Sequence, residues 1–346
     1  MNISLWQVSD VNRAYLMLAL FTAGGMLIFY QRLLYAPVVP LIQEEFNLEY
    51  LHVGLVPSAM MILTAIGYIA SGYLIYKYRN RKIIIIAFIA CVATATVTGT
   101  AQNYLQLVTF QSLIGICESL YYLPAVVLIA YWFPPEKLGK AVGTIEAGLN
   151  MGSFTVFGVG GIIALAVGWR TAYMLIAIPA LIITALLYKF VKEPENIEVS
   201  KPSFQGVLNN SYAWILASLS AIFFLDWYSI WEFAPTYLVN IKGLSITFAG
   251  FITSVMLAIA TPLAFIGGAL ADKFSPKKIG TIYFSILAAS IFIIGSTLTI
   301  LWTAIALLIA ASLLVGIFPI LVKAASQHFP LEKQTAAYTL LLIVGY

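Results

Sequence analysis

Four acidic side chains and one arginine stand inside segments that are otherwise apolar enough to cross a lipid bilayer: Arg32, Glu118, Glu146, Asp226 and Glu232. A charged group at the bilayer centre costs roughly 2.5 to 3.5 kcal/mol on insertion scales, so each is a functional candidate. The guanidinium of arginine can hold a carboxylate or phosphate through two parallel hydrogen bonds. A carboxyl group in a low-dielectric site favours its neutral form and can exchange a proton. The expected chemistry is therefore anion binding together with proton exchange.

Arg32 and Glu118 are the leading candidates among these residues. Arg32 lies in the outer part of the first apolar segment, where we expect it to bind the negative group of a solute. Snorkelling to the membrane surface, or pairing with an acid of another helix, is the alternative. Glu118 lies mid-segment with Gln111 and Tyr122 on the same helical face. We predict that Gln111 and Tyr122 contact the solute and that Glu118 exchanges protons, the alternative being a permanently protonated structural acid.

A later segment holds Asp226 and Glu232 among aromatic residues. These two acids are separated by about 120° around a helix, so they cannot face one point equally well. We rank Asp226 above Glu232 as a proton-exchanging group because it is deeper in the segment. Tyr228 and Trp231 are candidate solute contacts, with packing or a membrane-interface role as the alternative.

The composition shows what must position these groups. Hydrophobic residues make up 62% of the 346 residues and charged residues only 9%, against roughly 25% charged in soluble domains. The chain is therefore predicted to be an all-α polytopic membrane protein. Segments of about 20 residues are needed to cross the bilayer. Ten are expected, at residues 14–39, 53–76, 83–101, 104–132, 138–163, 168–189, 212–239, 247–271, 279–298 and 302–323.

The final apolar stretch, residues 336–346, is short. At about 1.5 Å per residue it would reach roughly halfway across a bilayer. We expect ten complete spans and part of an eleventh, with the natural chain continuing. A protein of ten spans that ends inside the membrane is the alternative.

Basic residues alternate between loops in a way that sets the orientation. Fifteen of the 18 Lys and Arg residues lie at the N-terminus or in every second loop, which predicts a multi-pass protein of the cell membrane with a cytoplasmic N-terminus. This distribution, despite a net charge of +4, argues against nucleic acid. The expected partners are the lipid bilayer, a small-molecule substrate, and protons or another coupling ion; we expect a monomer.

Several activities are not supported by the sequence. Cys91 and Cys117 fall in apolar runs, and His52 and His328 lie in separate loops, so no metal site or cofactor is expected. Those histidines offer no nucleophile and base pair, so we do not expect an enzyme. No phosphate-binding loop of the Gly-x-x-x-x-Gly-Lys-Ser/Thr kind is present, so energy should come from an ion gradient or from substrate exchange.

One loop pattern occurs twice. Residues 72–82 and 268–278 both read Gly-x-Leu-x-x-Lys-aromatic-x-x-basic-Lys, which indicates two related halves. The longest polar stretch lies between them. We therefore predict an N-terminal bundle at residues 1–190, a cytoplasmic linker at 191–211 and a C-terminal bundle at 212–346.

The chain resembles the major facilitator superfamily, whose signature loop reads Gly-x-Leu-x-Asp-basic-x-Gly-x-basic-basic. The second copy matches through Gly268, Leu270, Asp272, Lys273, Lys277 and Lys278, whereas the first keeps Gly72, Leu74, Lys77, Arg81 and Lys82 but has Tyr76 in place of the acid. The resemblance implies two six-helix bundles, the second incomplete here. It also implies that the loops hold the halves together in one state. The gating candidates are Gly72, Lys77, Arg81, Gly268, Asp272, Lys273 and Lys277.

Two further stretches are similar to the anion:cation symporter branch of that superfamily. Gln31-Arg32 stands where the branch often has Asp-Arg, and the fourth segment keeps Glu118 and Pro124 while Gln111 replaces an arginine. This resemblance implies proton-coupled transport of an organic anion through a cavity between the first, fourth, seventh and tenth helices. Export of hydrophobic or cationic compounds is the alternative, because acids outnumber the single arginine. Against it, Gly158–Gly161 lacks the proline of the antiporter motif.

Overall fold

The structure is a computed structural model that describes residues 8–193, 204–244, 246–296 and 299–346, and all of its regular elements are helices. Contacts divide the chain into two compact units. Unit 1 comprises Met1–Pro134 and Met151–Pro202, and unit 2 comprises Pro135–Asn150 and Ser203–Tyr346. Residues 194–203 of the predicted linker lie outside the described residues.

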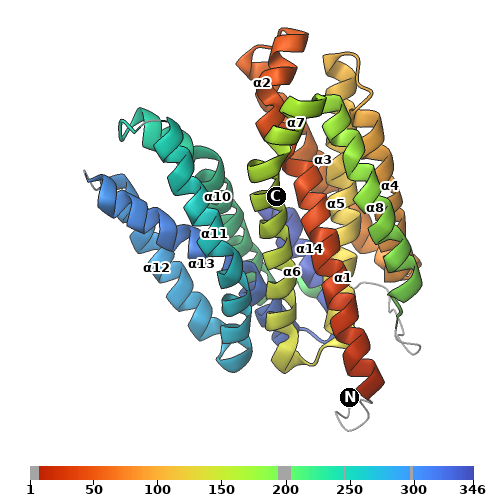
Figure 1. The fold of residues 1–346 in the computed structure, drawn as a ribbon. Coiled ribbons are helices and arrows are strands. Elements are labelled where there is room, and N and C mark those ends of the chain that lie inside the picture. Colours follow the sequence, from red (N-terminus) through yellow and green to blue (C-terminus); the bar gives the residue numbers. More distant parts are fainter. Residues whose placement is uncertain (1–7, 194–203, 245, 297–298) are drawn as a thin grey trace. The chain divides into compact units, whose positions relative to one another are not determined.

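The first span of unit 1 is broken in two. A single residue, Leu34, separates helix α1 (Val8–Leu33) from helix α2 (Tyr35–Phe46). Pro37 explains the break, because proline has no N–H to donate to the carbonyl of Leu33 and its ring crowds that carbonyl. Figure 1 shows α2 continuing beyond the end of α1. The break places Arg32 in the last turn of α1.

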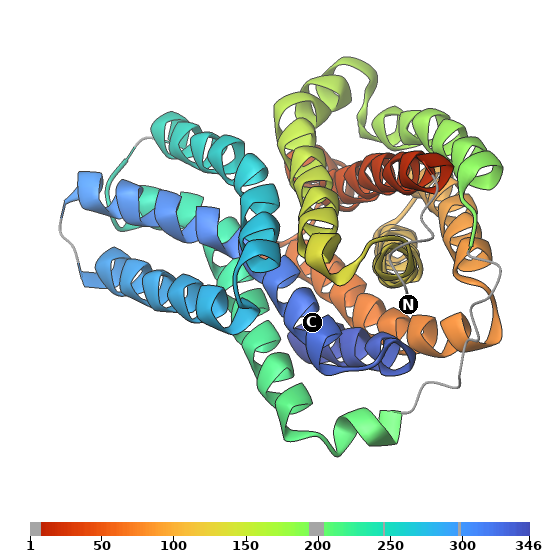
Figure 2. The same ribbon diagram turned by 90° about the horizontal axis from the view of Figure 1, so that it is seen from below.

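Helix α5 is the centre of unit 1. Helices α1, α3 and α4 pack against it, and Figure 2 shows it end-on among them. The close fit to α3 depends on glycine: a Cβ added at Gly115 would lie 2.4 Å from the carbonyl oxygen of Met60. Asn103 caps the start of α5 by accepting from the backbone N–H of Gln106 at 2.9 Å. Besides α1 and α2, the long helices of unit 1 are α3 (Tyr50–Lys77), α4 (Asn80–Thr98), α5 (Tyr104–Trp132) and α8 (Trp169–Phe190).

The predicted fifth span is a helix with an altered turn. Helix α6 (Pro135–Thr155) runs through a π-helical turn, η2 (Val156–Gly160), into α7 (Gly161–Val167). π-helical turns are rare and are often associated with functional sites. The end of α6 packs tightly on α1, since a Cβ at Gly152 would lie 2.2 Å from the carbonyl oxygen of Met26.

Unit 2 is arranged around α13, which packs against α10, α11 and α12. The close fit between α11 and α13 again depends on glycine, because a Cβ at Gly267 would lie 2.5 Å from the Cα of Gly316. Helix α14 packs against α10. The helices are α9 (Phe204–Leu208), α10 (Ser211–Asn240), α11 (Ile246–Lys273), α12 (Pro276–Ser296), α13 (Ile300–His328) and α14 (Leu331–Gly345).

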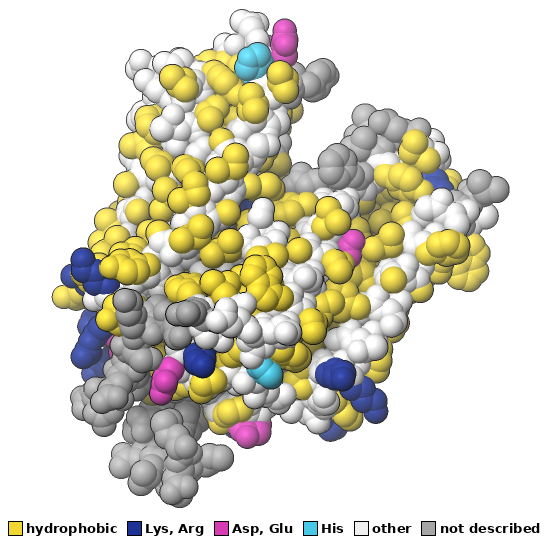
Figure 3. Space-filling view, turned by 180° about the vertical axis from the view of Figure 1, so that it is seen from behind, with side chains coloured by type: hydrophobic (Ala, Val, Ile, Leu, Met, Phe, Trp, Pro, Cys, Tyr) yellow, Lys and Arg dark blue, Asp and Glu magenta, His cyan; other side chains and the backbone are white. Residues whose placement is uncertain are grey.

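The helices suit a bilayer in length and surface. Eight helices within the described ranges are long and apolar enough to cross a membrane. Hydrophobic side chains cover much of the face drawn in Figure 3, as expected for a surface in contact with lipid tails. The all-α polytopic class is therefore confirmed, whereas the number of complete spans stays a prediction.

Candidate functional site

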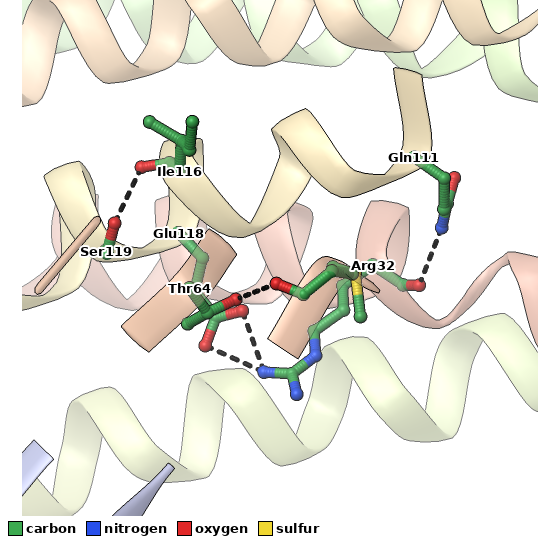
Figure 4. A network of polar contacts seen from close by, with 7 residues as sticks. Arg32, Thr64, Gln111, Ile116, Glu118 and Ser119 are labelled. Carbon is green, nitrogen blue, oxygen red and sulfur yellow. Dashed lines mark hydrogen bonds and ion pairs between the residues drawn. The ribbon is translucent and has the colours of Figure 1, made fainter. Parts of the chain in front are cut away.

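A buried ion pair joins Arg32 of α1 to Glu118 of α5 (Figure 4). The Nη1 atom of Arg32 donates to both carboxylate oxygens of Glu118, each at 2.7 Å. The two side chains are only 5% and 1% exposed. Of the alternatives for Arg32, the structure therefore shows pairing with an acid of another helix and excludes snorkelling in this conformation. Because both charges have left water, removing either partner would leave the other buried and uncompensated.

Gln111 fixes the end of α1 that carries the arginine. Its Nε2 atom donates to the carbonyl oxygen of Arg32 at 3.3 Å. Carbonyls in the last turn of a helix lack intrahelical donors, so this amide satisfies one of them. The Oε1 atom of Gln111 is buried without a hydrogen-bond partner among the described residues. Gln111 thus has a positioning role in this structure, and its contact with a solute stays a prediction.

The same face of α5 carries the rest of the predicted polar stripe. Glu118 and Tyr122 are both buried, one helical turn apart. Figure 4 also labels Thr64 of α3, whose hydroxyl donates to the carbonyl of Met60 at 2.9 Å. A Cβ added at Gly115 of α5 would lie 2.4 Å from this hydroxyl. Sequence analysis missed Thr64, because a threonine in an apolar helix gives no distinguishing signal.

Gln31, the neighbour of Arg32, sits in a neutral hydrogen-bond network. Its Nε2 atom donates to Thr94 Oγ1 at 3.1 Å and to the carbonyl of Cys91 at 3.3 Å. The Cys91 thiol donates to its Oε1 atom. These contacts join α1 to α4 and fill the hydrogen-bonding capacity of an uncharged amide. Cys91 and Cys117 are free and buried, as expected from the sequence.

The outer half of the first span is tied down separately. Glu45 Oε2, near the end of α2, accepts from Trp169 Nε1 at 2.8 Å and from Arg170 Nη1 at 2.6 Å. Arg170 also donates to the carbonyl of Ala101 at 2.8 Å. These contacts fix α2 to the start of α8, so both sides of the break next to Arg32 are anchored.

The candidates on α10 form an aromatic group in unit 2. Asp226 is half-buried and has no hydrogen bond or ion pair in the described part of the chain. Trp231 packs with Trp227, and its Nε1 atom is buried without a described partner. Tyr228 lies 6.3 Å from the ring of Tyr346. The side chain of Glu232 lies outside the described residues, and solute contact by Tyr228 and Trp231 stays a prediction.

In the second copy of the repeated loop, Asp272 is the centre of a hydrogen-bond cluster. It accepts from the backbone N–H groups of Gly139 at 2.8 Å and Lys140 at 2.6 Å. The Nζ atom of Lys323 donates to it at 2.8 Å, and that lysine is 1% exposed. From its position near the end of a helix, Lys323 would be expected to snorkel to the membrane surface. Instead, its ammonium group is buried and paired with Asp272. The cluster ties together α6, α11 and α13. Lys273 and Lys277 are exposed.

In the first copy, Tyr76 stands where an acid would be, and a carboxylate comes from elsewhere in unit 1. Glu193, just after α8, accepts from the backbone N–H of Arg81 at 3.0 Å and lies 3.8 Å from Arg79 Nε. Burial raises the pKa of Glu193 above its ordinary value, against the opposing effect of these donors. Sequence analysis missed Glu193, which is one of several acids in a polar stretch. Gly72 is buried and Lys77 is exposed.

The sequence profile of the Major Facilitator Superfamily matches residues 21–346. The chain belongs to this superfamily. Among relatives in the superfamily, the nitrite extrusion protein of Bacillus subtilis (strain 168) is 27% identical over 84% of this chain and 73% of its own length. The hexuronate transporter of the same organism is 26% identical over 75% of this chain and 64% of its own length. A probable nitrate transporter of Staphylococcus aureus (strain MRSA252) is 27% identical over 75% of this chain and 67% of its own length.

Solved structures of the superfamily share the fold. The proton:xylose symporter XylE is 17% identical, with a TM-score of 0.82 over 97% of this chain and 86% of its own. The human organic anion transporter MFSD10 is 13% identical, with a TM-score of 0.80 over 96% and 90%. These relatives and neighbours are named as transporters, so the expectation of a transporter rather than an enzyme is confirmed. A multi-pass membrane location follows from family membership and the apolar helices.

Proposed function

We propose that the chain is a proton-coupled secondary transporter of a small organic anion that works by alternating access, with Arg32 as the anion-binding group. The observation that carries the proposal is the buried Arg32–Glu118 pair at 2.7 Å. The relatives named for nitrite, nitrate and hexuronate all handle anions. Ten spans, a cytoplasmic N-terminus and a function as a monomer remain part of this proposal.

The geometry links the proton to the anion. While Glu118 is ionised, its two oxygens occupy the guanidinium of Arg32. Protonation removes the carboxylate charge and weakens this charge-assisted bond. The guanidinium is then available to a carboxylate or similar group of the solute. The anionic solute and the ionised carboxylate of Glu118 therefore compete for the guanidinium of Arg32. The solute can bind there only when Glu118 carries a proton, so the anion and the proton bind together.

The test is uptake into liposomes that contain the purified protein. Labelled glucuronate and nitrate would be offered with and without an imposed pH gradient, and exchange would be followed separately as counterflow without a gradient. We expect Glu118→Gln to lose accumulation driven by the pH gradient while keeping counterflow, since counterflow needs anion binding but no net proton movement. Gradient-driven accumulation that persists unchanged in Glu118→Gln would exclude the proton role.

Arg32→Gln tests the anion-binding role in the same liposomes. Loss of a hydrogen bond to a charged group costs about 1.5 to 3 kcal/mol, so apparent affinity should fall by about 10- to 100-fold in both assays. Arg13→Gln is the matched control, because it makes the same substitution near the other end of α1, away from the Arg32–Glu118 pair. Equal losses in Arg13→Gln and Arg32→Gln would indicate a general structural effect and contradict the proposal.

Export of a cation is the second candidate, favoured by the half-buried Asp226 without a described partner. A carboxylate that is not paired with a basic residue can attract a cationic solute. Growth in the presence of toxic cations separates the two candidates. Protection that depends on Asp226, combined with no uptake of organic acids, would favour export.

A further inference from the structure

A hollow opens between α3 and α4 at the end where the first loop copy joins them. Both helices pack along α5 but make few contacts with each other. The hollow has a volume of about 300 Å³ and is lined by Leu74, Tyr78, Lys82, Ile83, Ile86 and Leu120. These residues come from α3, the loop, α4 and α5. Four of the six are aliphatic, so the interior suits a hydrocarbon chain rather than a hydrated solute.

Lys82 lines this hollow, and Lys77 lies near the same lining residue, Tyr78. The Nζ atoms of Lys77 and Lys82 lie 5.5 Å and 5.2 Å from the centre of the Tyr78 ring. Both lysines are exposed, and Tyr78 itself is 40% exposed. Both ammonium groups are within the distance at which a cation is attracted to an aromatic ring. The hollow therefore has one lysine in its lining and a second lysine beside the same tyrosine.

The loop itself does not neutralise these charges. Tyr76 occupies the position that holds Asp272 in the second copy. The nearby carboxylate, Glu193, accepts from the backbone of Arg81 and lies 3.8 Å from Arg79. The cluster of four basic residues at 77–82 therefore carries a net positive charge at the membrane surface, where basic residues attract anionic lipid.

We propose that this hollow binds an anionic phospholipid, with its phosphate between Lys77 and Lys82 and one acyl chain along the aliphatic walls. The positive-inside rule assigns this end to the cytoplasmic leaflet, where anionic lipids face the loop. Free phosphate would use the lysines but not the four aliphatic side chains. The phospholipid is the occupant that satisfies both halves of the site.

The second loop copy is an internal control for charge. Lys273 and Lys278, which correspond to Lys77 and Lys82, are exposed at the corresponding end of α11 and α12. There, however, the equivalent aliphatic residues Leu270 and Ile279 pack into one cluster with Ile320 and Tyr283. Similar basic charge is thus present where the matching apolar side chains are already packed together.

The experiment is native mass spectrometry of the delipidated full chain titrated with phosphatidylglycerol or phosphatidylcholine of equal chain length. We expect preferential binding of one phosphatidylglycerol. In Lys77→Gln/Lys82→Gln its binding should weaken by about tenfold, because each lysine near an anionic surface contributes severalfold. Lys273→Gln/Lys278→Gln should bind like the parent. Equal weakening in both double variants would show non-specific surface attraction and overturn the proposal.

Two further measurements test the apolar half of the site. Ile86→Gln places a polar group in the wall, and we expect it to weaken phosphatidylglycerol binding without changing any charge. Inorganic phosphate in excess should fail to displace the lipid. Binding that is unaffected by Ile86→Gln, or displacement by inorganic phosphate alone, would show that the lysines act without the hollow and would overturn the proposal. No phosphatidylglycerol preference in the parent would do the same.

Discussion

The two copies of the repeated loop share a sequence pattern but differ in what their charges do. In the second copy, Asp272 collects two backbone N–H groups and the ammonium of Lys323. In the first copy, Tyr76 takes that position, and Lys77, Arg79 and Lys82 are exposed, whereas Arg81 donates to the carbonyl of Tyr188 at 2.6 Å. The acid of the second copy thus adds a buried connection between three helices, while the lysines of both loops stay exposed.

The comparison also shows that the missing acid is only partly replaced. Glu193 reaches the first copy from the end of α8 and accepts from the backbone of Arg81. Glu193 accepts a hydrogen bond from a backbone N–H in the first turn of α4, where N–H groups without an intrahelical acceptor favour a negative group. It leaves Lys77 and Lys82 over the Tyr78 ring. Glu193 therefore caps the start of α4 without neutralising the charges of Lys77 and Lys82.

The largest effect is expected from Asp272→Asn. The substitution leaves Lys323 buried without a counter-charge, and breaking a buried pair in this way costs about 3 to 5 kcal/mol. Thermal unfolding of the purified protein in detergent should show a clear decrease in midpoint. Asp272→Asn/Lys323→Met should recover much of the loss, because no buried charge remains. An unchanged midpoint in Asp272→Asn would remove the distinction between the copies.

A smaller loss is expected from Gly268→Ala. The added Cβ would lie 2.0 Å from the carbonyl oxygen of Gly139, so α6 and α11 would have to separate. Overpacking of this kind costs about 1 to 3 kcal/mol. Gly295→Ala is the control, since nothing lies within 4 Å of its added Cβ. The same thermal measurement should find it neutral or slightly stabilising; equal losses would show that the contact with Gly139 is unimportant.

Tyr76→Asp would restore the acid to the first copy. We expect phosphatidylglycerol binding to weaken severalfold, roughly the effect of cancelling one basic charge at the membrane surface. Native mass spectrometry measures the change, with Tyr76→Asn as the uncharged control. Weakening of equal size in Tyr76→Asn would assign the effect to the lost ring instead of the added charge.

The smallest effect is expected at Glu193. Burial raises the pKa of its carboxyl above the ordinary 4.5, so the folded chain keeps this proton to higher pH than the unfolded chain. Stability should therefore fall as pH rises from 4.5 through the raised pKa. Glu193→Gln should flatten this part of the curve of thermal midpoint against pH. The exposed Glu136→Gln should not, and an unaltered slope in Glu193→Gln would contradict the assignment.

Much of the helical framework was predictable from the sequence. Apolar runs placed the helices, because the cost of exposing polar groups to lipid acts on each residue locally. The break after Leu33 and the π-helical turn at Val156–Gly160 were not predicted. The short helix α9 was also missed, since Phe204–Leu208 lies beside the polar linker. Prolines and glycines marked two of these places without specifying the backbone that results.

For the candidate site, the sequence by itself determined which charged residues lie within or next to the membrane-spanning segments. Arg32, Glu118 and the duplicated loops stood out because each charge carries its own transfer cost wherever the chain folds. Only the tertiary structure decided the partners. Arg32 meets Glu118 across 86 positions and Lys323 meets Asp272 across 51. Such pairs depend on which helix faces pack together, and in a low-dielectric interior this contact sets whether a charge is stabilised or left costly.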